Sequence, residues 1–160
     1  MSAIFGGSIP DVGVSGMLVE AHPTNGCTQL TNPVKKGAED QIVFIARTPD
    51  EGDSCHFTVK VQNGQAAGYV AVIVYDYENG HIIHMAGVAP NITIPSVFVS
   101  ADVGHVMKKA GNQTLAHLTP DAAFMGSYFT SMAAAAACAM LLFAMAVVYQ
   151  RQHRFSNSIR

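Results

Sequence analysis

The C-terminal part of the chain contains a stretch of about 22 residues without a charged side chain, residues 128–149. A helix rises about 1.5 Å per residue, so this stretch reaches about 33 Å, enough to cross a hydrocarbon core of about 30 Å. Tyr128 and Tyr149 lie at its two ends, where an aromatic ring with a polar tip suits the membrane interface. The pattern predicts a transmembrane helix, with a buried helix of a larger soluble fold as the alternative.

Basic residues flank this stretch on one side only. Arg151 and Arg154 follow it closely, whereas the nearest upstream basic residue is Lys109. Because cytosolic flanks carry an excess of Lys and Arg, we expect residues 150–160 to form a short cytosolic tail. Residues 1–120 then face a lumen or the exterior, as in a single-pass type I protein.

A type I protein normally begins with a signal peptide, and the start of this chain does not resemble one. Residues 1–7 contain neither a basic segment nor an apolar segment of sufficient length. We therefore expect an incomplete N-terminus, the alternative being that the C-terminal helix translocates the domain by itself. The alanines at 133–137 would let a second helix approach closely, so self-association through this helix is a further expectation.

The overall composition excludes several classes of function. A hydrophobic fraction of 49% is sufficient for a packed core, while the net charge of −2 provides no basic surface for nucleic acid. Residues 1–120 carry no G-x-S-x-G, H-E-x-x-H or P-loop motif. The chain is therefore predicted to be non-catalytic, with no cofactor, no metal and no nucleic-acid partner.

Short apolar runs alternate with short amphipathic segments before the apolar stretch. This order predicts an α/β domain over 1–120, followed by a linker over 121–127. The predicted strands cover residues 14–20, 41–46, 70–75, 94–99 and 114–118. The predicted helices cover residues 55–67 and 101–109. The β-branched run at 70–75 is expected to be a central strand, and Pro95 places the next strand at an edge.

The helix boundaries follow from capping residues. Asp53 or Ser54 is expected to cap the first helix, which would bury Phe57 and Val61, and Ser100 is expected to cap the second.

Several motifs of the domain resemble a known family. They are CHFTVKVQNGQAAGYVAVIVYD at 55–76, HMAG at 84–87 and ITIPSVFVS at 92–100, preceded by FG at 5–6, GMLVEA at 16–21 and NGC at 25–27. In this order and spacing they are similar to the protease-associated (PA) domain, over about residues 3–118. The order of PA domain, membrane helix and basic tail resembles the PA–transmembrane–RING proteins, above all the plant receptor-homology branch linked to vacuolar cargo sorting.

The resemblance implies a compact β-rich α/β domain with mixed sheets and two or three short helices. It also implies a protein- or peptide-binding module for luminal cargo in the vacuolar, endosomal or Golgi system, without catalytic residues of its own. The ligand-binding loop it suggests lies after the central strand; its candidate residues are Asp76, Tyr77, Glu78, Asn79 and His81. A plain solvated loop is the alternative.

Two features depart from the family. Its RING finger, which carries ubiquitin-ligase activity and zinc ligands, has no counterpart in the ten or so residues after the membrane segment, so the alternative function is a truncated PA–transmembrane–RING ubiquitin ligase. Gly64 stands where family members usually have alanine.

Cys27 and Cys55 are the two cysteines of the domain, and Cys138 lies in the apolar stretch. Luminal topology and the family resemblance together imply a Cys27–Cys55 disulfide, with two unpaired thiols as the alternative. Asn91 and Asn112 begin N-x-T sequons and are candidate glycosylation sites.

Overall fold

The computed structural model describes residues 1–49, 55–111 and 114–120, and Met1–Pro120 fall within one compact unit. The predicted membrane helix, the linker and the tail lie outside the described residues, as do Asp53, Ser54 and Asn112. Among the residues that are described, no helix has the length and apolar character needed to cross a bilayer.

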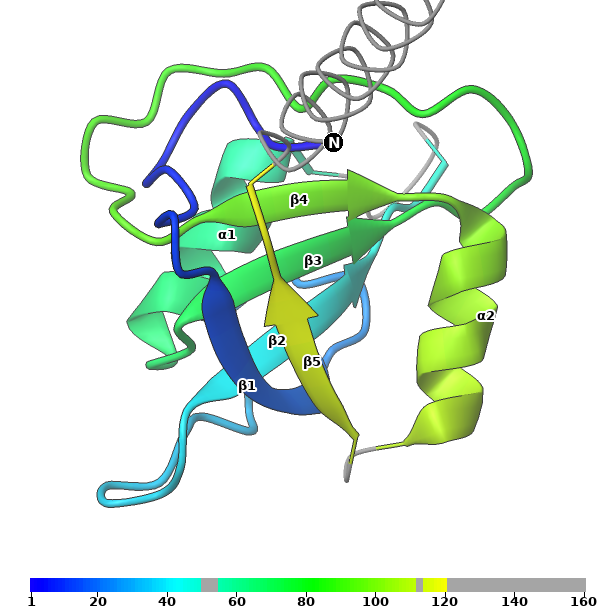
Figure 1. Cartoon of the computed structure of the whole chain (residues 1–160). Coiled ribbons are helices and arrows are strands. Elements are labelled where there is room, and N and C mark those ends of the chain that lie inside the picture. The colour runs from blue at the N-terminus through cyan, green and yellow to red at the C-terminus, as the bar shows by residue number, and fades with distance from the viewer. Residues whose placement is uncertain (50–54, 112–113, 121–160) are drawn as a thin grey trace, which may run out of the picture. The chain divides into compact units, whose positions relative to one another are not determined.

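The fold is a five-stranded mixed sheet with one helix on each face (Figure 1). Along the chain the elements are β1 (Val14–Glu20), β2 (Gln41–Ala46), α1 (Phe57–Ala66), β3 (Ala71–Tyr75), β4 (Ser96–Val99), α2 (Ala101–Ala110) and β5 (Leu115–Leu118). The sheet order is β4-β3-β2-β1-β5, in which β1 to β4 are parallel and β5 is antiparallel to β1. This β-rich α/β arrangement with two short helices agrees with the predicted fold class of the domain.

The strand predictions hold closely, and β2, β3 and β4 each contain a continuous apolar run. The bounds of β1 and β2 coincide with those predicted, and Pro95 immediately precedes β4 at the sheet edge, as expected. β3 is buried at every position. It is an interior strand, although the middle of the sheet is occupied by β2 rather than by β3.

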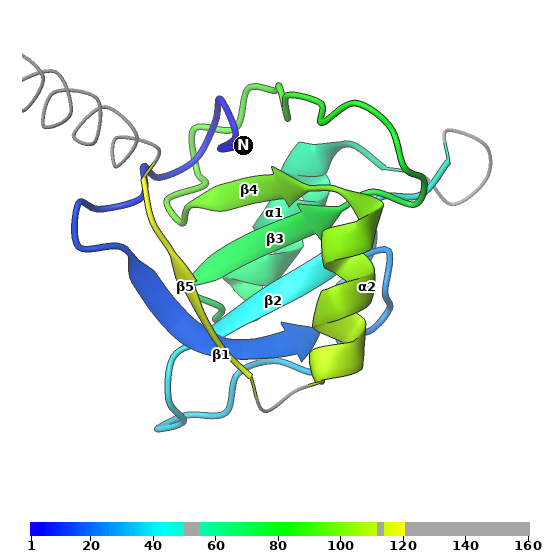
Figure 2. The same ribbon diagram turned by 45° about the vertical axis from the view of Figure 1, so that its right-hand side comes forward.

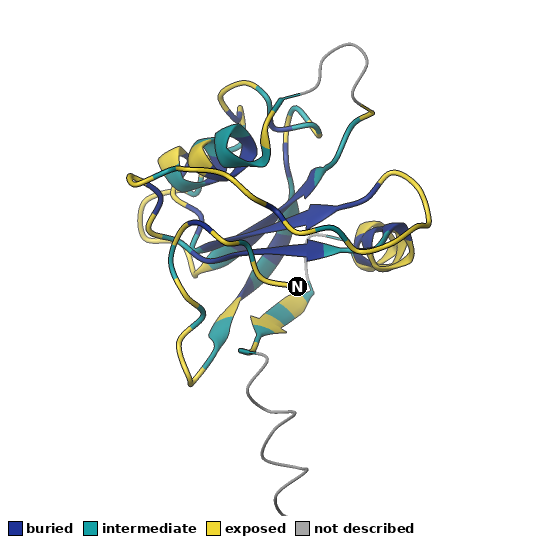
Figure 3. Ribbon diagram, turned by 90° about the horizontal axis from the view of Figure 1, so that it is seen from above, coloured by how far each residue is buried: buried dark blue, intermediate teal, exposed yellow. Residues whose placement is uncertain are grey.

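Two hydrophobic cores lie on opposite faces of the sheet. Figure 2 shows α1 behind the sheet and α2 in front of it. The α1-side core includes Val61, Val43 and Val72, whereas the α2-side core includes Met107 and Phe44. Figure 3 shows that burial is concentrated in β2, β3 and β4, whereas β1 and β5 are mostly half-buried or exposed.

The face of α1 differs from the one predicted. Val61 is buried as expected, but Phe57 is only partly buried, and the other fully packed positions are Lys60 and Gly64. Gly64 lies where the helix approaches the sheet, since a Cβ atom there would lie 2.7 Å from a methyl carbon of Val72. Close backbone approach thus explains the glycine that departs from the family pattern.

The helix caps also differ from the predictions. α1 begins at Phe57 with His56 as N-cap, so Asp53 and Ser54 lie too far upstream to cap it. Ser100 is the N-cap of α2, as predicted, but its side chain makes no capping hydrogen bond.

The N-terminal segment covers the outer edge of β4. The amide of Ala3 donates to the carbonyl of Ser96, and the amide of Phe98 donates to the carbonyl of Met1. These bonds pair backbone groups that a sheet edge would otherwise leave open.

Candidate binding site at the carboxyl edge of the sheet

The carboxyl ends of the parallel strands bring together residues that are distant in sequence. Ala46 and Tyr75 are register partners at the ends of β2 and β3, so Arg47 and Asp76 follow them side by side. Ligands of open parallel sheets bind at this edge. The loop predicted to bind ligand begins here.

An ion pair holds the start of this loop. Arg47 Nη1 lies 3.1 Å from Oδ1 and 3.3 Å from Oδ2 of Asp76, and the Asp76 side chain is 5% exposed. Oδ1 also accepts a 2.8 Å hydrogen bond from the amide of Tyr77. Because Asp76 is buried and engaged in this way, its position suits orienting the loop better than contacting a ligand.

Tyr77 presents an aromatic surface beside this pair. Its side chain is 42% exposed, and the guanidinium carbon of Arg47 lies 5.1 Å from the ring centroid. A guanidinium at this distance attracts the ring face through a cation–π interaction and restricts its motion. Tyr77 and Arg47 together form a partly exposed surface that is apolar on the ring and cationic at its margin.

The rest of the predicted set lies on the exposed part of the loop. Glu78, Asn79 and His81 are all exposed. The Nδ2 group of Asn79 donates a 3.1 Å hydrogen bond to Oδ1 of Asp102 in the first turn of α2. The structure therefore places four of the five predicted residues on the surface and the fifth, Asp76, beneath them.

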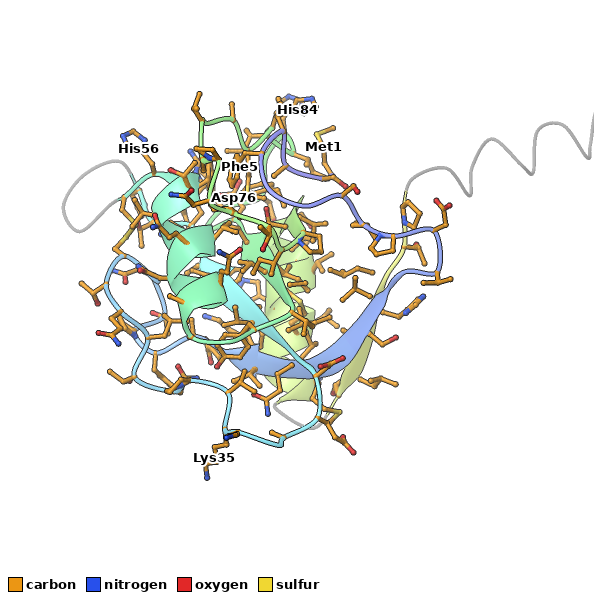
Figure 4. The ribbon with its side chains drawn as sticks, turned by 90° about the vertical axis from the view of Figure 1, so that its left-hand side faces the viewer. Met1, Phe5, Lys35, His56, Asp76 and His84 are labelled. Atoms are coloured by element: carbon orange, nitrogen blue, oxygen red, sulfur yellow. A yellow bond between two sulfur atoms is a disulfide. The ribbon has the colours of Figure 1, made fainter. Side chains whose placement is uncertain are left out.

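Figure 4 shows where this loop lies in the domain. Asp76, His56 and His84 are at one end of the molecule, and Lys35 is at the other. Among the described residues, no three or more His, Cys, Asp or Glu side chains are grouped so as to hold a metal ion.

The disulfide lies on the α1 side of the same edge. Cys27 and Cys55 are bonded, with 5.6 Å between their Cα atoms, and the bond joins the turn after β1 to the residue before the N-cap of α1. This is the pairing that the family resemblance implied.

Lys60 is buried next to this disulfide. Its Nζ donates to the carbonyl oxygen of Asn25 and to that of Ala46 at 3.1 Å, and it lies 3.5 Å from Sγ of Cys27. Burial lowers the pKa of Lys60 from 10.5 to about 8. These contacts join α1, the end of β2 and the turn after β1.

Sequence reasoning missed both cationic residues of this edge. For Arg47 the available signal was its place directly after a buried strand. For Lys60 it was helical spacing, since position 60 shares a helix face with Gly64. Neither signal reveals the partner, because each partner comes from a different element.

Of the two predicted glycosylation sequons, the one at Asn91 lies among the described residues. Asn91 is exposed, whereas the Thr93 hydroxyl lies 3.2 Å from Oε1 of Gln65. Asn112 lies outside the described residues.

Comparison with known proteins assigns this domain to a family. The profile of the PA domain matches residues 14–107, which is more than half of the chain. The chain belongs to the PA-domain family.

Relatives of this PA protein include plant and animal members. It is 36% identical to receptor homology region, transmembrane domain- and RING domain-containing protein 1 of Oryza sativa subsp. japonica, over 83% of this chain and 24% of the relative. It is 33% identical to human E3 ubiquitin-protein ligase RNF13, over 68% of this chain and 29% of the relative. With protein 6 of the receptor homology series from Arabidopsis thaliana the identity is 31%, over 92% of this chain and 46% of the relative.

These relatives are PA–transmembrane–RING proteins, so the resemblance predicted from the motifs is confirmed. The chain spans between about a quarter and a half of their length. Membrane association is therefore a property of the family to which this PA domain is homologous.

A solved structure supports the fold independently. The zinc aminopeptidase BSAP from Bacillus subtilis superposes with a TM-score of 0.54 at 18% identity, over 74% of this chain and 26% of that one. At this identity the likeness concerns the fold alone.

Proposed function

We propose that this PA domain is a protein- or peptide-binding module held on the luminal side of an endomembrane by residues 128–149, where it recognises cargo for sorting. Membership of the PA family and relatives that carry a transmembrane domain support the anchored module. The observation that carries the binding role is the exposed Tyr77 ring held over Arg47 at the carboxyl edge of the sheet.

The chemistry of this surface suggests the kind of cargo segment. An aromatic ring offers apolar contact area, and a guanidinium favours carboxylate groups, with which it forms directional hydrogen bonds. Arg47 is already paired with Asp76 and is 21% exposed, so an incoming carboxylate would contact only part of the group. We therefore expect recognition of a peptide that carries an apolar side chain next to an acidic group.

Site-specific photocrosslinking tests this proposal. A photoreactive phenylalanine analogue placed at Tyr77 in the full-length chain should capture luminal proteins in cells. The same analogue at Lys35, which is exposed at the opposite end of the domain, is the matched control (Figure 4). If both positions captured the same proteins to the same extent, cargo recognition by this loop would be wrong.

A second function is favoured by the names of the relatives. RNF13 is an E3 ubiquitin-protein ligase, and receptor homology proteins contain a RING domain. The present residues would then be the luminal and membrane-anchoring part of a ligase whose RING lies in additional sequence. Sequencing the complete transcript distinguishes the two: a cross-brace pattern of Cys and His codons favours the ligase, and a stop codon directly after Arg160 favours the adaptor.

A further inference from the structure

Lys60 is a buried cation, and the part of the chain that the structure describes supplies no buried anion to balance it. Its side chain is 1% exposed, and its three polar neighbours are two carbonyl oxygens and the sulfur of Cys27. No carboxylate among the described residues pairs with it. A buried ammonium held only by neutral groups carries a desolvation cost that a nearby negative charge would offset.

The sulfur of Cys27 is the group that can supply this negative charge. In the disulfide it is neutral, but after cleavage of the bond it becomes a thiolate 3.5 Å from Nζ of Lys60, if the neighbouring backbone keeps its place. An opposite charge within about 4–6 Å lowers an acid pKa by roughly 1–3 units. Lys60 therefore makes Cys27 the better leaving group of the two cysteines.

The dipole of α1 favours a thiolate on Cys55 instead, but this effect is weaker than that of Lys60 on Cys27. Cys55 precedes His56, the N-cap of α1, so the helix dipole also favours a thiolate there. The effect of such a dipole falls off beyond the first turn of the helix, and Cys55 lies before that turn. Among the described residues, no cationic side chain is hydrogen-bonded to the Cys55 sulfur. The direct contact with Lys60 is the larger effect.

We propose that the Cys27–Cys55 disulfide is a directional thiol-exchange site that becomes covalently modified at Cys55. An incoming thiolate, from a low-molecular-weight or protein thiol, attacks Sγ of Cys55 and forms a new S–S bond with it. The Cys27–Cys55 bond breaks, and its electron pair leaves on Cys27 as a thiolate paired with the Lys60 ammonium. No proton moves in this step, and the reverse attack by Cys27 restores the disulfide.

This exchange acts on the edge of the sheet that carries the candidate binding loop. The disulfide ties the turn after β1 to the start of α1, and Lys60 also bonds the carbonyl of Ala46, the residue before Arg47. Opening the bond releases the constraint between this turn and α1, and Lys60 connects both of them to the residue before Arg47. The proposal does not depend on which cargo that loop binds.

Mapping the mixed disulfide tests the direction of exchange. The full chain in detergent, with Cys138 blocked beforehand by N-ethylmaleimide under non-reducing conditions, is exposed to glutathione. Excess iodoacetamide is added at intervals to cap the released thiol and prevent resealing. Mass spectrometry of the peptides should find glutathione on Cys55 and carbamidomethyl on Cys27. Glutathione mainly on Cys27, an equal split, or no adduct on either would overturn the proposal.

Variants at position 60 test whether Lys60 sets the direction of thiol exchange. Lys60→Met keeps the apolar stem and removes the charge, so exchange should slow by about fivefold or more and lose its preference for Cys55. Lys35→Met, a change at an exposed position, should behave like the unmodified chain. If Lys60→Met does not fold, Lys60→Arg retains the charge and should keep the Cys55 preference; mapping on the unmodified chain remains decisive in either case. Equal rates for a folded Lys60→Met and the unmodified chain would contradict the role of Lys60.

Discussion

At the carboxyl edge of the sheet, the side chains of Asp76 and Tyr77 have different roles. Asp76 is buried and bonded to both Arg47 and the amide of Tyr77, which fixes where the loop starts. Tyr77 is 42% exposed and lies beside the guanidinium of Arg47. Buried pairing at the base and exposure at the tip are what a binding loop on a rigid sheet requires.

Lys60 gives the domain a predictable pH dependence of stability. Its pKa is lowered to about 8 in the folded protein, from 10.5, so the unfolded chain binds more protons between these two values. The free energy of unfolding should therefore rise as the pH increases from about 8 to about 10.5, and this contribution is absent below pH 8, where both states are protonated.

Denaturant titrations at pH 7.5 and pH 10 check this expectation by comparison with Lys60→Met, which has no proton to lose. The stability of the unmodified chain relative to Lys60→Met should increase with pH, whereas its stability relative to Lys35→Met should not change. A relative stability of Lys60→Met that is the same at both pH values would show that the burial of Lys60 has no energetic cost.

At the scale of elements, both helices depend on glycine to approach the sheet. Gly104 faces Tyr75, and a Cβ atom at position 104 would lie 2.5–2.8 Å from three carbon atoms of that side chain. Real Cβ atoms do not come so close, so either α2 or Tyr75 must move when a methyl group is added.

Gly104→Ala should therefore destabilise the domain by about 1–3 kcal/mol, because overpacking exceeds the gain in helix propensity. Val106→Ala is the matched control, since Val106 lies on the same helix and is 67% exposed. It should change stability by less than about 0.5 kcal/mol in the same denaturant titration. Equal stability of Gly104→Ala and the unmodified chain would mean that α2 can shift outward without loss.

The side chain of Gln65 connects α1 to the segment before β4. Its Oε1 accepts from the amides of Thr93 at 2.7 Å and Ile94 at 3.3 Å, while its Nε2 donates to the carbonyl of Asn91 at 2.8 Å. One side chain thus satisfies three backbone groups of a segment that belongs to no strand.

Gln65→Ala should destabilise the domain by about 1–2 kcal/mol and increase hydrogen exchange at the amides of Thr93 and Ile94. Gln62→Ala, an exposed position on the same helix, should leave both amides protected. Unchanged exchange in Gln65→Ala would indicate that the segment is ordered by its other contacts.

The sequence predicted the elements better than the contacts between them. Strand bounds were correct to within two residues, because apolar runs such as 41–46 and 70–75 consist of residue types that are usually buried. Lys60, Gly64 and Gln65 were not predicted to be structurally important, because their roles depend on partners 8 to 35 residues away that only the folded chain brings close. The position of the loop after β3 could be predicted, but not the division between buried Asp76 and exposed Tyr77.

At the scale of the whole molecule, the proposed membrane helix anchors the PA domain to a membrane. The disulfide closes a separation of 28 residues, which stabilises a fold by roughly 3–4 kcal/mol in the chain-entropy model and suits an oxidising compartment. The relatives with a transmembrane domain agree with an anchored protein. The two proposals, cargo binding at the carboxyl edge and thiol exchange at Cys55, place the domain on the non-cytosolic side of the membrane.

Protease protection in sealed microsomes tests this topology most directly. The full chain is synthesised with an epitope in the exposed loop around Gly37 and another after Arg160, and the vesicles are treated with protease before and after detergent. The Gly37 epitope should survive until detergent is added, whereas the C-terminal epitope should be lost at once. Loss of the Gly37 epitope from intact vesicles would contradict this topology.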